Sequence, residues 1–448
     1  MNFVSTKQRR IAKLAKQSPQ MAFTSLAHHI DISWMHEAYR RTRKDGATGV
    51  DDVTAAEYEV DLEGNLQRLL DRAKSGTYRA PPVRRVHIPK GSSGETRPIG
   101  IPTLEDKILQ RAVVMLLEPI FEHDFLECSY GYRPKRSAHQ ALVSLQQQAS
   151  MNRGAWILEV DIRKFFDTLD HQHLHELLQR RIRDGVVLRL IHKWLHAGVM
   201  EDGNLSYPEM GSPQGGVISP LLANIYLHYV LDEWFHTDVL PRLEGRATML
   251  RYADDFVVLF ERESDAQRFF QVLPKRFGKF GLTIHPDKTR LIPFQRPLPQ
   301  SSAKGTPSHT TTTPNRGGRP GTFDFLGFTH FWARSRRGNW IVKRKTARSR
   351  FIRAVRAIDD WCRKHRHQPI PLQHQKLNAK LRGHFAYFGM MHNFRALQNL
   401  RHLAERTWHR WLNRRHRRRT MIWAKFQRLL RCYPLAPARI NRSALRFT

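Results

Sequence analysis

The clearest hydrophobic pattern in this chain is a pair of apolar runs that flank a short acidic turn. Residues 248–252 and 256–260 are rich in aromatic and aliphatic side chains, and Asp254 and Asp255 lie between them. This arrangement predicts a β-hairpin that presents two carboxylates at its tip. Adjacent carboxylates repel each other, so a cation such as Mg²⁺ beside them would favour this pattern, although it also fits a solvated turn.

A second apolar run, residues 155–162, predicts a strand that carries Asp161 at its end. Phosphoryl transfer with two metal ions requires carboxylates from separate elements that converge on ions about 3.5–4 Å apart. A strand-end aspartate and a hairpin with two more would supply such a set. Taken alone, Asp161 equally fits a surface residue that ends a strand.

The remaining pattern predicts a mixed α+β protein. We expect residues 24–75 to be mostly helical. Residues 76–150 should form an antiparallel hairpin followed by helices, one of which runs over 104–117 and is ended with the help of Pro119. An apolar helix is predicted from Leu221 to about Leu231. Strands are predicted over 323–340, and three or four basic helices over 341–430.

Ordered motifs along most of the chain carry a resemblance to a known family. They are Lys44–Asp51, Arg85–Lys90, Thr96–Pro102, Ser129–Pro134, the Asp161 strand, Gly211–Asn224, Tyr252-Ala253-Asp254-Asp255, Gly281–Thr289, Phe323–Phe328 and Leu377–Phe385. With these motifs in this order, the chain resembles the reverse transcriptases encoded by bacterial group II introns, which also act as maturases. The match runs from about residue 40 to about residue 430.

The resemblance implies a right-hand polymerase, with fingers and palm built from an antiparallel sheet and helices, and an α-helical thumb. The implied domains are 1–75, a basic extension with the template loop; 76–340, fingers and palm; 341–430, thumb and maturase domain; and 431–448, a short basic tail. Residues 295–322 are rich in Pro, Ser, Thr and Gly, which predicts a disordered insertion within the second domain.

The resemblance also implies the site residues. Asp161, Ile162, Asp254 and Asp255 would form the site for two Mg²⁺ ions, with Mn²⁺ as the alternative, and the three aspartates would be catalytic. Phe166 would pack under the sugar and exclude a 2′-hydroxyl, although Phe165 and Phe166 also fit a palm core.

Four polar residues are implied to surround the incoming nucleotide. Lys90 and Arg97, on either side of a Gly-Ser-Ser-Gly turn, would contact its phosphates. Gln214, in a glycine-rich loop, would line the pocket near the template base. Lys288, after a short strand, would approach the triphosphate. Each of the four also fits a solvated surface position.

The charge of the chain indicates a nucleic-acid partner. The chain has 448 residues and a formal net charge of +35, and residues 331–448 hold 31 Lys and Arg against 3 Asp and Glu. The densest run supplies the predicted RNA-binding residues Arg414, Arg415, Arg417, Arg418 and Arg419. Four aromatic residues are interleaved with it: Trp408, Trp411, Trp423 and Phe426. Cationic helices of this kind bind phosphates, while their aromatic residues also fit a helix core.

Other chemistry is poorly supported. Cys128, Cys362 and Cys432 are too far apart for a disulfide framework or zinc spacing. His171, His173 and His175 follow Asp170, an expected helix N-cap, and would spread over different helix faces rather than form a metal site. No apolar run approaches transmembrane length, so we expect a bacterial cytoplasmic protein, associated with the nucleoid when it acts on DNA.

The expected function is RNA-directed DNA polymerisation together with binding of the intron RNA for splicing and retrohoming. The expected partners are a group II intron RNA template, a DNA primer or target and dNTPs, with no membrane; monomer and homodimer both remain open. The short tail leaves no room for an endonuclease module, so mobility would use a pre-existing 3′ end. Two alternatives remain: a free-standing reverse transcriptase recruited to defence or DNA repair, and a protein that is chiefly an RNA-binding splicing factor.

Overall fold

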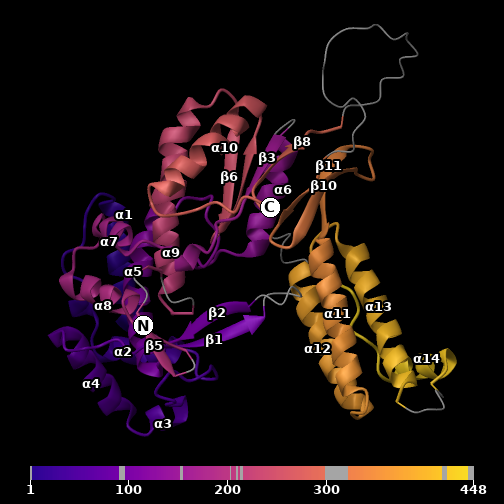
Figure 1. The fold of residues 1–448 in the computed structure, drawn as a ribbon, viewed down its shortest axis with the longest axis horizontal. Helices are drawn as coiled ribbons and strands as arrows, with labels where there is room; N and C mark the ends of the chain where they lie inside the picture. Colours follow the sequence, from indigo (N-terminus) through magenta and orange to yellow (C-terminus); the bar gives the residue numbers. More distant parts are fainter. Residues whose placement is uncertain are drawn as a thin grey trace.

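The protein folds into a sheet-centred body and a separate bundle of helices, as Figure 1 shows. This computed structural model describes residues 3–89, 96–151, 155–201, 203–207, 210–211, 215–297, 321–415 and 421–441. The expected α+β class is confirmed. We use the names fingers, palm and thumb for the three parts described below.

The palm is built on an antiparallel sheet with strand order β6-β7-β3-β8. Its strands are β3 (Ala155–Val160), β6 (Ala247–Tyr252), β7 (Asp255–Phe260) and β8 (Arg290–Phe294). Alternate residues of β7 enter two different cores, with Val258 on one face and Val257 on the other. Helix α10 (Glu263–Gly278) packs on the first face and α6 (Ala138–Met151) on the second. Burial on both faces explains why β7 reads as a continuous apolar run.

The fingers combine a second sheet with a layer of helices. The sheet has strand order β2-β1-β4-β5, in which β1 (Val83–Pro89) and β2 (Thr96–Ile101) form the expected antiparallel hairpin. The short strands β4 (Val199–Glu201) and β5 (Asn204–Ser206) extend it. The helices are α1 (Phe3–Gln17), η1 (Ala27–His29), α2 (Ile32–Arg41), α3 (Ala55–Glu59), α4 (Leu62–Ser75), α5 (Leu104–Asp124), α7 (His171–Gln179) and α8 (Gly185–Leu195).

Helix α5 corrects one expectation, because Pro119 lies inside it and does not end it. Proline lacks the N–H that would bond to the carbonyl four residues earlier, which is that of Met115. Gln8 of α1 fills this gap, since its Nε2 donates to Met115 O at 2.8 Å. Ile120 and Phe121, beyond the proline, are fully buried, so core packing holds the last turn in place.

The predicted apolar helix after the glycine-rich loop also differs from its expected course. Helix α9 runs over Ser219–Leu227 and passes into two π-helical segments, η3 (His228–Glu233) and η4 (Phe235–Val239), followed by the 3-10 turn η5 (Leu240–Arg242). A π-helical insertion within a helix frequently marks a functional site. Here it places Asp232 in the protein interior, where its side chain is fully buried.

The thumb consists of the helices α11 (Arg348–His365), α12 (Ile370–Phe388), α13 (Phe394–Asn413) and α14 (Trp423–Cys432). Its own core contains Trp408 and Phe426, both fully buried. A three-stranded sheet of β9 (Phe323–Phe325), β10 (Phe328–Arg334) and β11 (Trp340–Thr346) connects it to the palm. Strand β11 therefore continues past residue 340, where we expected the sheet to end.

Within the described residues, no helix is long and apolar enough to cross a membrane. Most of the predicted insertion, residues 298–320, lies outside the part of the chain that the structure describes, as do the last residues of the predicted tail, 442–448.

Asp184 joins two segments of the fingers and gives a test of this packing. Its buried carboxylate accepts bonds from the backbone N–H groups of Leu26, Ala27, Val186 and Val187, at 2.6–3.0 Å. Asp184→Ala would leave these donors without their acceptor, and we expect a loss of about 3 kcal/mol in the free energy of unfolding, measured by urea denaturation.

The matched control is Asp170→Ala. Asp170 caps α7 through a single bond from His173 N at 2.8 Å, so its removal should cost only about 1 kcal/mol. Equal losses in the two variants would show that Asp184 acts only as a helix cap.

Candidate active site

The predicted acidic hairpin is present and its tip is sharply bent. Tyr252 and Asp255 form the last pair between β6 and β7, which leaves Ala253 and Asp254 as the two turn residues. Ala253 has φ of 59°, in the left-handed region that an alanine seldom adopts. The bend places Asp254 in the turn and Asp255 at the first position of β7.

Asp161 reaches the same edge from the neighbouring strand. Strand β3 pairs with β7 so that Val160 lies opposite Phe256, which places Asp161 beside the start of β7. Burial and repulsion by Asp161 raise the pKa of Asp254. Burial, Asp254 and Asp161 together raise the pKa of Asp255 to about 6, although one side of Asp255 is open to solvent. The three carboxylates therefore share one electrostatic environment.

Lys288 forms an ion pair with one member of this set. Its Nζ donates to Asp161 Oδ2 at 3.0 Å. The expected strand before Lys288 is wrong: the residue lies in a turn that precedes β8, and an isolated bridge between Ile162 and Ile284 is the only pairing in that segment of the described chain. This bridge and a bond from His285 N to Asp161 O, at 2.8 Å, hold the turn against the end of β3.

A cavity of about 280 Å³ opens beside the carboxylates. Asp161, Asp255 and Lys288 line it from the palm, Gly327 from the β9–β10 turn, and Arg350 from the first turn of α11. Arg350 and Lys288 both oppose the rise in the pKa of Asp255. Arg350 was not identified from the sequence, because its proximity depends on the thumb folding back onto the palm.

The donor chemistry of the site suits a hard cation. Three carboxylates meet here, the pKa values of Asp254 and Asp255 are raised, and carboxylate oxygens are the preferred ligands of Mg²⁺. Ile162 is buried next to Asp161. Among the described side chains, no three His, Cys, Asp or Glu are arranged to enclose a metal ion, and Asp161 instead faces Lys288.

Phe165 and Phe166 have different surroundings. They lie in the 3-10 turn η2 (Phe165–Asp167), where Phe165 is buried and packs edge-on against Tyr226. Phe166 is only partly buried. Its carbonyl adjoins Gly211, where an added Cβ would lie 2.9 Å from Phe166 O. Phe165 is therefore a core residue, whereas the partly buried Phe166 packs at the margin of that core and its carbonyl adjoins Gly211.

The fingers hairpin brings Arg97 toward the same site. Arg97 lies opposite Ile88 in the hairpin and opposes the rise in the pKa of Asp254. Gly215 packs closely on the hairpin, since a Cβ there would be 2.3 Å from Gly100 O. Lys90 and Gln214 lie outside the described residues.

Tyr132 is a residue near the site that the sequence reasoning missed. It has φ of 56°, its side chain is exposed, and its ring lies 6.5 Å from that of Tyr252. A non-glycine residue with positive φ in a motif is the kind of strained position that clusters at functional sites. The dihedral angle was not readable from the sequence.

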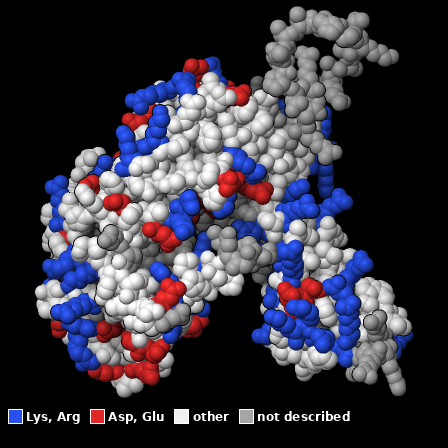
Figure 2. All heavy atoms as spheres, in the orientation of Figure 1, with Lys and Arg blue, Asp and Glu red and all other residues white. Residues whose placement is uncertain are grey.

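The thumb carries the expected basic surface, and Figure 2 shows Lys and Arg gathered over its helices. Arg414 lies over the ring of Trp411, with 5.1 Å between Cζ and the ring centroid. Arg415 donates to the carbonyls of His367 and Gln368 at 3.0 and 2.8 Å. Arg417, Arg418 and Arg419 lie outside the described residues. Trp408 and Phe426 are core residues, as the alternative interpretation required.

Comparison with known families gives two matches. Residues 88–330 match the family described as reverse transcriptase (RNA-dependent DNA polymerase). Residues 349–432 match the group II intron, maturase-specific domain. The first match covers the end of β1, all of β2, the Asp161 strand and the turn with Asp254 and Asp255, and the second covers the thumb helices.

Similar proteins include intron-encoded ones. The chain is 38% identical to protein YkfC of Escherichia coli over 327 residues, which cover 64% of this chain and 84% of YkfC. It is 39% identical to the group II intron-encoded protein LtrA of Lactococcus lactis over 223 residues, 49% of this chain but only 36% of LtrA. Nuclear intron maturase 2 of Arabidopsis thaliana is 27% identical over 232 residues, 43% of this chain and 30% of that protein.

The raised pKa of Asp255 predicts a stability cost in metal-free protein. The pKa rises from about 3.9 in an unfolded chain to about 6 in the fold. Between these pH values the folded state binds the proton more tightly than the unfolded state does, so the free energy of unfolding falls as the pH rises. We expect Asp255→Asn in EDTA to melt at a higher temperature than the wild type above pH 6, with the difference vanishing near pH 4.

The control is Asp287→Asn, an exposed carboxylate next to Lys288, which should leave the melting temperature unchanged at both pH values. If Asp255→Asn is not more stable at pH 7.5, the carboxylates do not repel one another as described.

Proposed function

This chain belongs to the reverse transcriptase family and carries a group II intron maturase-specific domain, and from that premise we propose that Asp161, Asp254 and Asp255 are its catalytic residues. The proposed reaction is the template-directed addition of deoxynucleotides to a primer 3′-hydroxyl, with RNA as the template. The observation that carries this assignment is the convergence of the three carboxylates at one edge of the palm sheet, where they raise the pKa values of Asp254 and Asp255.

Asp161, Asp254 and Asp255 would hold two Mg²⁺ ions, with Ile162 beside them and Mn²⁺ as the alternative. When bound, such ions make the 3′-hydroxyl easier to deprotonate and stabilise the charge on the departing pyrophosphate. The chain's part is to present the carboxylates from the end of one strand and from the neighbouring hairpin. The shared negative charge of the set disfavours the metal-free state and so favours cation binding.

The nucleotide pocket is proposed to lie between the palm and the fingers hairpin. Arg97, with Lys90, would contact the triphosphate, and Gln214 would line the pocket near the template base. Lys288 would also approach the triphosphate, which requires it to leave Asp161; its ion pair is half-exposed, and such pairs contribute only about 0–1 kcal/mol. Phe166 would lie under the sugar and exclude a 2′-hydroxyl.

The maturase role is proposed to reside in the thumb. Its helices match the maturase-specific domain and carry most of the excess positive charge, which suits intron RNA, and Arg414, Arg415, Arg417, Arg418 and Arg419 would contribute to that binding. Splicing and retrohoming of a group II intron would follow from the two activities together. The proposed place of action is the bacterial cytoplasm and nucleoid.

Two further interpretations make different demands. A free-standing enzyme in defence or repair would have no folded intron RNA around its gene, and sequencing the flanking DNA distinguishes that case. A protein that acts chiefly in splicing would not require polymerisation, although the intact set of three carboxylates favours an active polymerase.

The first test is primer extension on an RNA template with Mg²⁺. We expect the double variant Asp254→Ala, Asp255→Ala to lose at least a thousandfold in DNA synthesis, because two of the three carboxylates proposed to hold the metal ions are absent. Binding of intron RNA, measured by filter retention at fixed salt, should change by less than threefold. Splicing of the flanking intron should persist in the variant.

Synthesis by the double variant at the wild-type rate would reject these residues as catalytic. A wild-type protein that makes no DNA but binds and splices its intron would favour the splicing-factor interpretation.

A second test concerns sugar discrimination. Phe166→Ala removes the bulk proposed to exclude the 2′-hydroxyl, so we expect the ratio of kcat/KM for dNTP over rNTP to fall by at least tenfold. Phe165→Leu is the matched control, because it changes the buried neighbour while leaving Phe166 in place. An unchanged ratio in Phe166→Ala would assign Phe166 to the core.

A further inference from the structure

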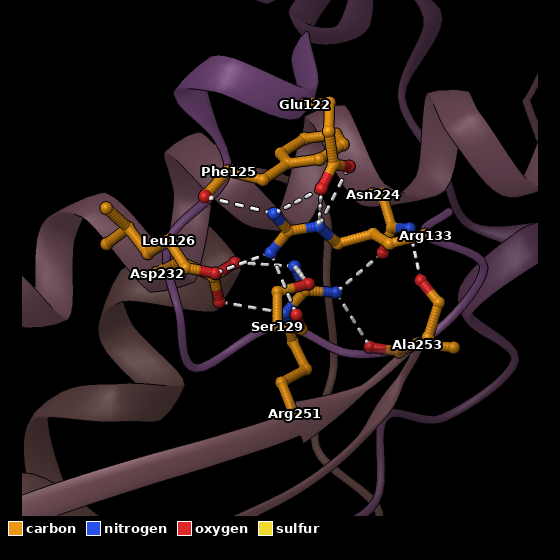
Figure 3. Close-up of polar contacts among 10 residues, drawn as sticks. Glu122, Phe125, Leu126, Ser129, Arg133, Asn224, Asp232, Arg251 and Ala253 are labelled. Atoms are coloured by element: carbon orange, nitrogen blue, oxygen red, sulfur yellow. Dashed lines mark hydrogen bonds and ion pairs between the residues drawn. The ribbon is translucent and has the colours of Figure 1, made fainter. Parts of the chain in front are cut away.

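A fully buried ion pair lies directly behind the catalytic turn (Figure 3). Arg251, in β6, and Asp232, in η3, both have side chains with no exposed surface. Arg251 Nε donates to Asp232 Oδ1 at 2.8 Å and Nη2 to Oδ2 at 2.5 Å, so the pair is bidentate. Burial opposes the charged guanidinium, but the adjacent Asp232 outweighs it and raises the pKa of Arg251. The arginine therefore remains a cation.

The remaining donors of Arg251 converge on the turn and its supports. Nη1 donates to Ala253 O at 3.0 Å and to Asn224 Oδ1 at 2.9 Å, and Nη2 donates to Ser129 Oγ at 2.8 Å. A guanidinium has five N–H donors, and each of the five has an acceptor here. The Arg251 guanidinium thus fixes the carbonyl of Ala253, which immediately precedes Asp254.

The loop of the fingers motif at residues 128–133 closes around the same point. Arg251 N donates to Cys128 O at 2.8 Å, and Arg251 O accepts from Tyr130 N at 2.9 Å. Asn224 of α9 also donates to Gly131 O at 2.7 Å. Gly131 lies against the turn so closely that a Cβ would be 2.3 Å from Ala253 N.

A second arginine anchors that loop to helix α5. Arg133 pairs with Glu122 at 2.8 Å and donates to the carbonyls of Leu126 and Ser129 at 2.6 and 2.9 Å. The catalytic turn is therefore connected, through Arg251, to the fingers loop, to α9 and to η3. Three separate parts of the chain thus meet at one guanidinium.

Stability alone does not account for this arrangement. A buried ion pair often contributes no more than apolar residues of equal volume would, because removing two charges from water costs about as much as their attraction returns. What apolar residues could not supply is the bond to Ala253 O. That bond holds a residue with φ of 59°, a conformation that costs of order 1–3 kcal/mol and persists only when its surroundings fix it.

We propose that Arg251 is a positioning residue that sets the orientation of the Asp254-Asp255 turn for metal binding, with Asp232 as its anchor. The inference rests on the proposed polymerase function. Asp254 and Asp255 repel each other and Asp161, and would otherwise move apart. The Arg251 guanidinium holds the peptide between Ala253 and Asp254 in one orientation. Through Arg251, a displacement of residues 128–133 would also move the catalytic carboxylates.

The test uses the full-length protein and compares Arg251→Lys with Arg181→Lys. Arg181 is also buried, pairs with Asp124 at 2.8 Å and donates to backbone carbonyls, but it contacts the N-terminal segment of the fingers and not the catalytic turn. Both variants should lose thermal stability. Only Arg251→Lys should lower kcat by at least tenfold and raise the Mg²⁺ concentration for half-maximal synthesis by at least threefold, with KM for primed template unchanged.

A double variant, Arg251→Met with Asp232→Leu, separates position from stability and serves if Arg251→Lys does not fold. Its apolar pair leaves no buried charge, so it should recover part of the melting temperature lost in Arg251→Lys without restoring kcat or the Mg²⁺ requirement. The inference would be overturned if kcat and the Mg²⁺ requirement recovered together with stability in the double variant. Equal kinetic losses in Arg181→Lys would overturn it as well. Either result would make the Arg251–Asp232 pair purely structural. An inactive wild type would instead reject the polymerase function on which the inference rests.

Discussion

The repulsion among Asp161, Asp254 and Asp255 is the constraint on which the rest of this structure depends. A sheet edge that gathers three carboxylates is unfavourable without a cation, and burial and mutual repulsion raise the pKa values of Asp254 and Asp255. The fold holds them together through strand pairing, since β3 and β7 are hydrogen-bonded neighbours within a sheet that is buried on both faces. Core packing thus maintains a site that electrostatics alone would disperse.

Cations from three parts of the chain surround this edge. Lys288 comes from the palm, Arg97 from the fingers hairpin and Arg350 from the first thumb helix. Each comes from a different part of the chain, so a movement of the fingers or the thumb would change the charge beside the carboxylates. This arrangement suits a polymerase, which must bind a triphosphate and then release pyrophosphate.

The fingers and palm are also linked through buried polar groups. Arg251 and Arg133 connect the Asp254-Asp255 turn with the 128–133 loop and α5, and every donor of the Arg251 guanidinium has a partner. Such fully satisfied networks specify one geometry more sharply than apolar packing does, because a displaced donor leaves a buried polar group unpaired. The thumb, by contrast, has a separate apolar core and presents its charge to solvent.

The sequence by itself determined the local elements and the chemical class of the site. Alternating and continuous apolar runs located the β6–β7 hairpin and β3, and the motif order identified the carboxylates, because these signals depend only on neighbours along the chain. Tertiary structure alone decided the rest. Pro119 stays within α5 because Gln8 of a distant helix satisfies the freed carbonyl, and Arg251 and Arg350 acquire their roles from partners far away in sequence. Such contacts leave no local pattern, since their free energy arises only when separate elements pack together.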